Sequence, residues 1–130
     1  MQAYIVDLPN QPGSLAAVCQ ALAARGINIE GLAGATAGAT GTFAFLADDH
    51  AAAGMVLQEH GWAYREVDLV VATLAHRPGS LAAAAGRIAE AGVNVETMFA
   101  LGMDGDRVEV AFGVSDAAAA KSALGDLAAR

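Results

Sequence analysis

The chain has 130 residues, 55% of them hydrophobic and 5% aromatic, and a formal net charge of −7. This length fits one ordinary domain or two very small ones, and the composition excludes a disordered chain. The negative charge disfavours nucleic acid and anionic membrane surfaces as partners, and no apolar run is long enough to span a bilayer. The N-terminus lacks the basic start of a signal peptide. The single cysteine, Cys19, excludes an internal disulfide, so we expect a cytoplasmic protein.

The first half of the chain predicts strands and helices in the order βαββαβ. Alternation of β-forming residues predicts the strands, and apolar residues three and four apart predict the helices. In order, we expect a strand at 2–8, a turn at 9–13, a helix burying Leu15, Val18, Cys19 and Leu22, a strand at 27–32, a loop at 33–41, a strand at 42–47, a helix ending at His60, and a strand at 62–67. Asp48 or Asp49 caps the second helix, and Gly26 and Gly61 end the two helices.

The second half predicts the same order without its last strand. We expect a strand at 69–74, a turn at 75–79, a helix burying Leu81, Ala84, Ala85 and Ile88, strands at 93–101 and 107–114, and a helix capped by Ser115 or Asp116. The Asp-Gly pair at 104–105 is a good hairpin signal. Nothing that predicts a strand follows the last helix.

An internal repeat explains this similarity. The run Pro-Gly-Ser-Leu-Ala-Ala at 12–17 recurs 66 residues later at 78–83, and Asn28 recurs as Asn94 at the same offset. We therefore predict two repeats, at 1–67 and at 68–130, the second shortened at its C-terminal end. Each is an α+β unit with the ferredoxin-like layout, in which helices cover one face of an antiparallel sheet.

The Pro-Gly turns are candidate ligand loops. Residues 10–14 lead into a helix N-terminus, where free N–H groups and the helix dipole favour a carboxylate. Gly13 lets a ligand approach the backbone closely, and Asn28 on the neighbouring strand offers both a donor and an acceptor. In the second repeat Arg77 stands where the first has Gln11, so we expect the second loop to prefer an acidic ligand.

These motifs resemble the ACT domain. The shared features are a strand, Asn or His two residues before a Pro-Gly pair, a helix, and Gly-Ile-Asn-Ile or Gly-Val-Asn-Val. The resemblance implies a free-standing tandem ACT protein that binds an amino acid or a similar small carboxylate and regulates something else. Serine-regulated phosphoglycerate dehydrogenases of this family use the polar residue before Pro and the strand Asn, which correspond here to Asn10 and Asn28, and to His76 and Asn94. Leu8 and Leu74 stand where those enzymes have a histidine, which departs from the serine-binding pattern.

The resulting ligand-binding candidates belong to the two loops and the two strands. They are Asn10, Gln11, Gly13, Ser14, Asn28 and Ile29 in the first repeat, and His76, Arg77, Gly79, Ser80, Asn94 and Val95 in the second. Each also has a plainer interpretation, because Pro-Gly serves in ordinary turns, a buried Asn often bonds a loop, and His76 fits an exposed turn.

Catalysis has little support in the sequence. The histidines lack metal-ligand spacing, Cys19 lies on an apolar helix stripe, and the Gly-rich run at 31–41 leads into a strand rather than the helix that a dinucleotide site needs. We expect no enzyme activity, no metal and no cofactor. The alternative to a sensor is an interaction module without a ligand, acting on a regulated enzyme or a transcription factor.

The absent last strand predicts an assembly. Without it, the strand at 69–74 would present an unpaired apolar edge, which proteins do not leave bare. We therefore expect a homodimer with contact at or near these residues, and a sheet that continues between units or chains.

Overall fold

The computed structural model describes residues 1–129, which form two compact units. The first unit is Gln2–Glu66, and the second consists of Met1 together with the chain from Val67 onward. Each unit is described by itself below.

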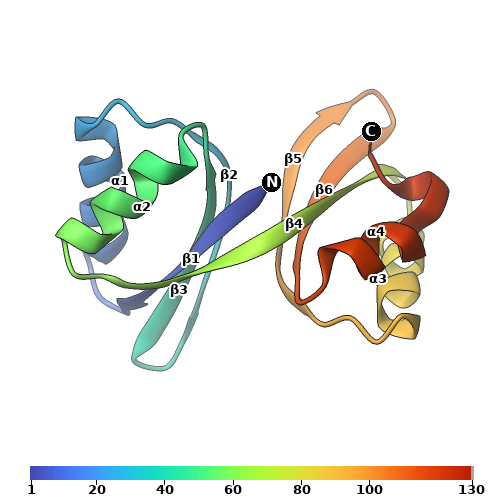
Figure 1. The fold of residues 1–130 in the computed structure, drawn as a ribbon, viewed down its shortest axis with the longest axis horizontal. Helices are drawn as coiled ribbons and strands as arrows, with labels where there is room; N and C mark the ends of the chain where they lie inside the picture. Colours follow the sequence, from blue (N-terminus) through green and yellow to red (C-terminus); the bar gives the residue numbers. More distant parts are fainter. Residues whose placement is uncertain (130) are drawn as a thin grey trace. The chain divides into compact units, whose positions relative to one another are not determined.

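The first unit has two helices and an antiparallel sheet (Figure 1). Its elements are β1 (Gln2–Pro9), α1 (Ser14–Ala24), β2 (Ile29–Ala37), β3 (Thr40–Ala47), α2 (His50–Glu59) and the start of β4 (Ala63–Ala75). The strand order is β2-β3-β1-β4, which is the ferredoxin-like order. Its core is aliphatic and aromatic, and the largest fully buried side chains are Phe45, Leu22, Leu57, Val6, Val18 and Val56.

The second unit repeats this arrangement in the strand order β4-β6-β5. It contains the remainder of β4, α3 (Ser80–Glu90), β5 (Val95–Asp104), β6 (Arg107–Val114), α4 (Ala117–Leu124) and a short 3-10 turn, η1 (Gly125–Leu127). Phe112, Ile88 and Leu124 are its largest fully buried side chains. Among the described residues no strand follows η1, as the sequence predicts, and the α+β class is confirmed.

The helix boundaries follow from local chemistry. Asp49 caps α2 by accepting a hydrogen bond from the Ala52 N–H, and Asp116 caps α4 by accepting one from Ala119. Gly26 follows the end of α1 with a φ of 69°, a backbone conformation that favours glycine. The sequence therefore located these helix ends correctly, and the structure selects Asp49 and Asp116 from the two pairs of candidate caps.

Two predicted connections are wrong because both segments extend as strands. The expected loop at 33–41 is a hairpin, in which β2 continues to Ala37 and β3 begins at Thr40. Cross-strand bonding here overrides the poor strand propensity of Gly and Ala. The expected separate strands at 62–67 and 69–74 form one strand, β4, because the single residue between them, Asp68, is neither Gly nor Pro and does not turn the chain.

The predicted unpaired edge at 69–74 is also wrong. The Leu69 N–H donates to the Met1 carbonyl at 2.9 Å, and the Ala129 N–H donates to the Val71 carbonyl at 2.7 Å. Ala72 and Ala128 form an antiparallel bridge. The chain therefore covers part of this edge with its own ends, and the edge gives no reason for a dimer.

The buried helix stripes are narrower than predicted. Val18 and Leu22 of α1 are fully buried, and Cys19 packs partly against the same core. Leu15, in the first turn of the helix, is 52% exposed. In α3 the corresponding pair, Ala84 and Ile88, is buried, whereas Leu81 and Ala85 are exposed.

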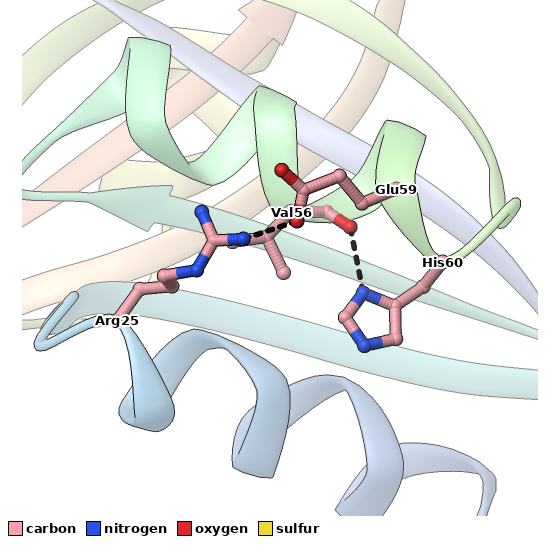
Figure 2. Close-up of polar contacts among 4 residues, drawn as sticks. All are labelled: Arg25, Val56, Glu59 and His60. Atoms are coloured by element: carbon pink, nitrogen blue, oxygen red, sulfur yellow. Dashed lines mark hydrogen bonds and ion pairs between the residues drawn. The ribbon is translucent and has the colours of Figure 1, made fainter.

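A polar contact joins the ends of the two helices of the first unit (Figure 2). The Arg25 guanidinium, just after α1, forms an ion pair with Glu59 at the end of α2. The neighbouring His60 ring contacts the Val56 carbonyl through Nδ1 at 2.9 Å (Figure 2). Since both members of the ion pair are about half exposed, it contributes little to stability.

None of the helices in residues 1–129 has the length and apolarity to span a membrane. The same residues contain no group of three His, Cys, Asp or Glu side chains able to hold a metal ion.

Candidate functional site

Both Pro-Gly loops end in a glycine that precedes a helix without a side-chain cap. Gly13 has a φ of 91° and Gly79 a φ of 89°, which are left-handed conformations that L-residues adopt only with strain. A capping Ser, Asp or Asn would occupy the first N–H groups of the helix, and glycine cannot. These groups therefore remain available to an anion.

Only some of the backbone N–H groups at the start of the helix donate hydrogen bonds within the loop. In the first unit the Ser14 N–H donates to the Gln11 carbonyl at 3.3 Å, and Ala17 donates to Gly13 at 3.0 Å. The N–H groups of Leu15 and Ala16, between them, are left to a ligand or water. The second unit repeats the pattern, with Ser80 donating to Arg77 and Ala83 to Gly79.

A hollow adjoins the loop of the first unit. It has a volume of about 510 Å³, within the usual range of ligand pockets. Asn10, Gln11 and Ser14 from the loop line it together with apolar residues that include Leu15, Leu32 and Phe43. An adjoining hollow of about 400 Å³ reaches Gly13 and Trp62. The first site is thus apolar, with a few neutral polar groups.

A hollow of about 640 Å³ in the second unit corresponds, by the repeat offset of 66 residues, to the hollow that reaches Gly13 and Trp62. Arg77, Gly79 and Ser80 from the predicted set line it, as do Arg87 and Arg107. The structure therefore brings together the loop candidates of each unit, with the exception of His76, which is exposed beside the second hollow.

Asn10 and His76 occupy equivalent positions with similar backbone bonds. The Asn10 N–H donates to the Ala39 carbonyl at 2.9 Å, and the His76 N–H donates to Asp106 at 2.6 Å. Asn10 also donates from its side chain to the Gly38 carbonyl at 2.9 Å. In each unit the Pro-Gly loop is thus attached to a β-hairpin turn, which fixes the mouth of the hollow.

Asn28 and Asn94 lie away from these loops within their own units. The Asn28 N–H donates to the Asp48 carboxylate at 3.0 Å, and Asn94 donates to the Ser115 hydroxyl at 3.1 Å. Asn28 follows the C-terminal end of α1, and a helix of 11 residues is about 16 Å long. One unit therefore does not bring Asn28 to the same small ligand as residues 10–14.

Ile29 and Val95 are partly buried and pack against the cores of their own units. They begin β2 and β5, next to Asn28 and Asn94, and they do not line the hollows described above. Their place in the structure is that of packing residues.

The sequence did not point to Arg87, Arg107 or Leu32 as site residues. Arg107 reaches the hollow because β6 begins opposite the end of β4, where it pairs with Ala75. Arg87 lies on α3, two turns beyond the loop. The one available signal was the recurrence of Arg at 77, 87 and 107 in a chain with seven Lys and Arg residues.

Comparison with known protein families decides the assignment. Residues 5–60 match the family model of the ACT domain. Residues 5–60 are an ACT domain. The second unit carries the same Pro-Gly-Ser-Leu motif and the strand order β4-β6-β5, so it repeats the ferredoxin-like layout of the first unit.

Solved structures with a similar fold match nearly the whole chain. Protein BT0572 from Bacteroides thetaiotaomicron has 24% identity and a TM-score of 0.78, over 95% of this chain and 85% of that one. The ligand-free regulatory subunit of aspartate kinase from Thermus thermophilus has 24% identity and a TM-score of 0.69, over 97% and 90%. The corresponding subunit from Thermus flavus has 24% identity and a TM-score of 0.65, over 95% and 88%. At this identity the likeness concerns the fold, and no curated protein matches the chain.

Proposed function

We propose that this protein is a non-catalytic regulatory sensor that binds a free amino acid or a similar small carboxylate at its Pro-Gly loops. The observation that carries the proposal is the repeated combination of an uncapped helix start with a hollow beside it, at Gly13 and at Gly79. The ligand carboxylate accepts hydrogen bonds from the first-turn N–H groups, where the helix dipole also favours negative charge.

The structural neighbours support a regulatory role. Two of them are regulatory subunits of aspartate kinase, and they share the arrangement of the whole chain. We propose that this protein likewise acts in the cytoplasm on a separate target, either an enzyme or a transcription factor. Asn28 and Asn94 then have a structural role, through their hydrogen bonds to Asp48 and Ser115, unless a second copy of the chain brings them to a ligand.

A carboxylate built into the helix start tests this proposal. In Ser14→Asp and Ser80→Asp, the new carboxylate occupies the N-terminus and repels the ligand, while it stabilises the helix by about 0.3–1 kcal/mol. We expect a saturating amino acid to stabilise the unmodified protein by about 2.7 kcal/mol at 100 times its Kd. Ser14→Asp removes this effect at the first hollow and Ser80→Asp at the second, as measured by thermal shift and calorimetry with the twenty amino acids.

Ala51→Asp and Ala118→Asp are the matched controls. Both residues are exposed in the first turn of a helix, α2 or α4, that has an Asp cap and no Pro-Gly loop. These variants should retain ligand binding. If no amino acid or small carboxylate binds the unmodified protein, the sensor proposal fails and the ligand-free interaction module takes its place.

We also propose that the protein is a homodimer, on a ground other than the edge at 69–74. Large apolar side chains are exposed at equivalent positions of the two units, namely Leu15 and Leu32 in the first, and Leu81 and Met98 in the second. Their exposed fractions run from 37% to 59%, and such repeated apolar exposure is typical of a contact surface.

Light scattering at micromolar concentration measures this assembly. We expect the mass of two chains for the unmodified protein and a shift toward one chain for the double variant Leu32→Gln/Met98→Gln. Met55→Gln is the control, since Met55 is 55% exposed on α2 and has no exposed apolar equivalent in the second unit. A monomeric unmodified protein would refute the dimer.

A further inference from the structure

The two hollows differ in charge. The described residues that line the two adjoining hollows of the first unit include no ionisable side chain. Three arginines and one carboxylate line the hollow of the second unit, which gives it a charge of +2 in a chain whose net charge is −7. A positively charged hollow on a protein of negative net charge attracts anions to that place, although the rest of the protein repels them.

The arginines arise at positions that are uncharged in the first unit. The repeat offset relates Arg77 to Gln11 and Arg87 to Ala21. Strand register relates Arg107 to Thr40, because Arg107 pairs with Ala75 as Thr40 pairs with Pro9. All three differences therefore lie around one hollow, and each adds a guanidinium.

Arg87 is held in place. Its Nη1 donates to the Leu124 carbonyl at 2.7 Å and to the Asp126 carboxylate at 3.0 Å. This bond lowers the pKa of the Asp126 carboxyl. A guanidinium has five donors, so Arg87 can bind a further anion with the donors that Nη1 does not carry. The two hydrogen bonds thus hold the Arg87 guanidinium at the side of the hollow.

Acidic groups near the hollow do not cancel its charge. Asp106 is the one carboxylate among the described lining residues, which include three arginines. Asp126 partly neutralises Arg87 but is itself exposed. With both acids counted, the site retains one positive charge in addition to the partial charge of the α3 N-terminus.

We infer that the second hollow selects small dicarboxylates, such as acidic amino acids. This inference rests on the function proposed above, because one carboxylate of the ligand binds the helix start at Gly79 and Ser80. The second carboxylate binds the guanidinium groups, which suit a carboxylate through paired, charge-assisted hydrogen bonds. The first hollow, without charged groups, takes neutral ligands.

Titration calorimetry with matched ligands tests the selectivity. Aspartate, glutamate and succinate are compared with asparagine and glutamine, which have the same shapes with one carboxylate replaced, and with inorganic phosphate. We expect the dicarboxylates to bind the second hollow at least about tenfold more tightly than the amides, because charge-assisted hydrogen bonds are roughly twice as strong as neutral ones. Added salt should reduce this difference.

Substitutions in the second hollow test whether its residues cause the selectivity for dicarboxylates. Arg77→Gln and Arg107→Thr restore the residues of the first unit, and each should weaken dicarboxylate binding about tenfold without affecting a neutral amino acid at the first hollow. Ser80→Asp should abolish dicarboxylate binding, and Ser14→Asp should leave it intact. Arg25→Gln is the control, since it removes the same charge from a surface ion pair of the first unit.

The outcomes separate this inference from the proposed function. If asparagine and glutamine bind the second hollow as tightly as their acids, or if Arg77→Gln and Arg107→Thr have no effect, the selectivity is refuted and the sensor remains. Binding of phosphate alone would likewise refute a dicarboxylate site. If no amino acid or dicarboxylate binds either hollow, both proposals fail.

Discussion

Gly54→Ala is expected to destabilise the protein by about 1–3 kcal/mol, although Ala is the better helix former. Gly54 lies inside α2 and packs against Tyr4 of β1. A Cβ at residue 54 would lie 3.2 Å from the Tyr4 Cζ and closer still to its hydroxyl oxygen. Urea unfolding of the variant and the unmodified protein measures the difference.

Tyr4 has little freedom to move away from this methyl group. It is 2% exposed, and its ring stacks on His50 at a centroid distance of 4.2 Å and packs edge-on against Tyr64 at 5.6 Å. Its hydroxyl donates to the His50 carbonyl at 2.8 Å. The added methyl group must therefore either break this bond or displace the ring, and both cost stability.

Gly86→Ala is the matched control, since Gly86 lies inside α3 and no atom lies within 4 Å of its added Cβ. This substitution should stabilise the protein by about 0.5–1 kcal/mol through helix propensity alone. Two glycines in helix interiors thus give effects of opposite sign. An equal gain in both variants would contradict the packing of Gly54 against Tyr4.

A second large effect is expected at high pH, where the protein should lose stability through Tyr4. Burial raises the pKa of Tyr4 from 10.0 to about 12, and the nearby Glu66 carboxylate adds to this rise. Because the folded state holds the proton more tightly, the contribution of Tyr4 is complete below pH 10 and is lost as the pH rises toward 12. The total loss is about 2.7 kcal/mol, with about half of it by pH 11.

Comparison with Tyr4→Phe isolates this contribution. Other groups ionise over the same pH range in both proteins, so the difference between their urea-unfolding curves from pH 8 to pH 12 reports on Tyr4. Tyr64→Phe removes the second of the two tyrosines of the chain and should keep the steep loss. If Tyr4→Phe loses stability with pH as steeply as the unmodified protein, Tyr4 is not the group responsible.

Local signals in the sequence were sufficient for the fold class and most element ends. Gly26 ends α1 in a left-handed conformation and Asp49 caps α2, because both effects depend on neighbouring residues alone. The repeat of Pro-Gly-Ser-Leu predicted a second unit of the same kind, and the structure contains it. The loops of the candidate sites were predictable for the same reason, since a glycine before an uncapped helix is a local feature.

Strand continuity and edge pairing depended on tertiary contacts. β4 is a single strand, and its edge is covered in part by Met1 and Ala129 from the two ends of the described chain. No local pattern at these residues distinguishes a paired backbone from a free one, since pairing depends on which segment arrives beside it.

Tertiary contacts also determined which residues line the candidate sites. The sequence placed Asn28 near the loop, but α1 separates them because a helix carries the chain from one end of the sheet to the other. It gave no reason to join Arg77, Arg87 and Arg107, which lie on a turn, a helix and a strand. The sequence by itself determined two similar units with a loop in each. Only the tertiary structure decided that one hollow is neutral and the other positive, because charges from distant segments add up only where the fold brings them together.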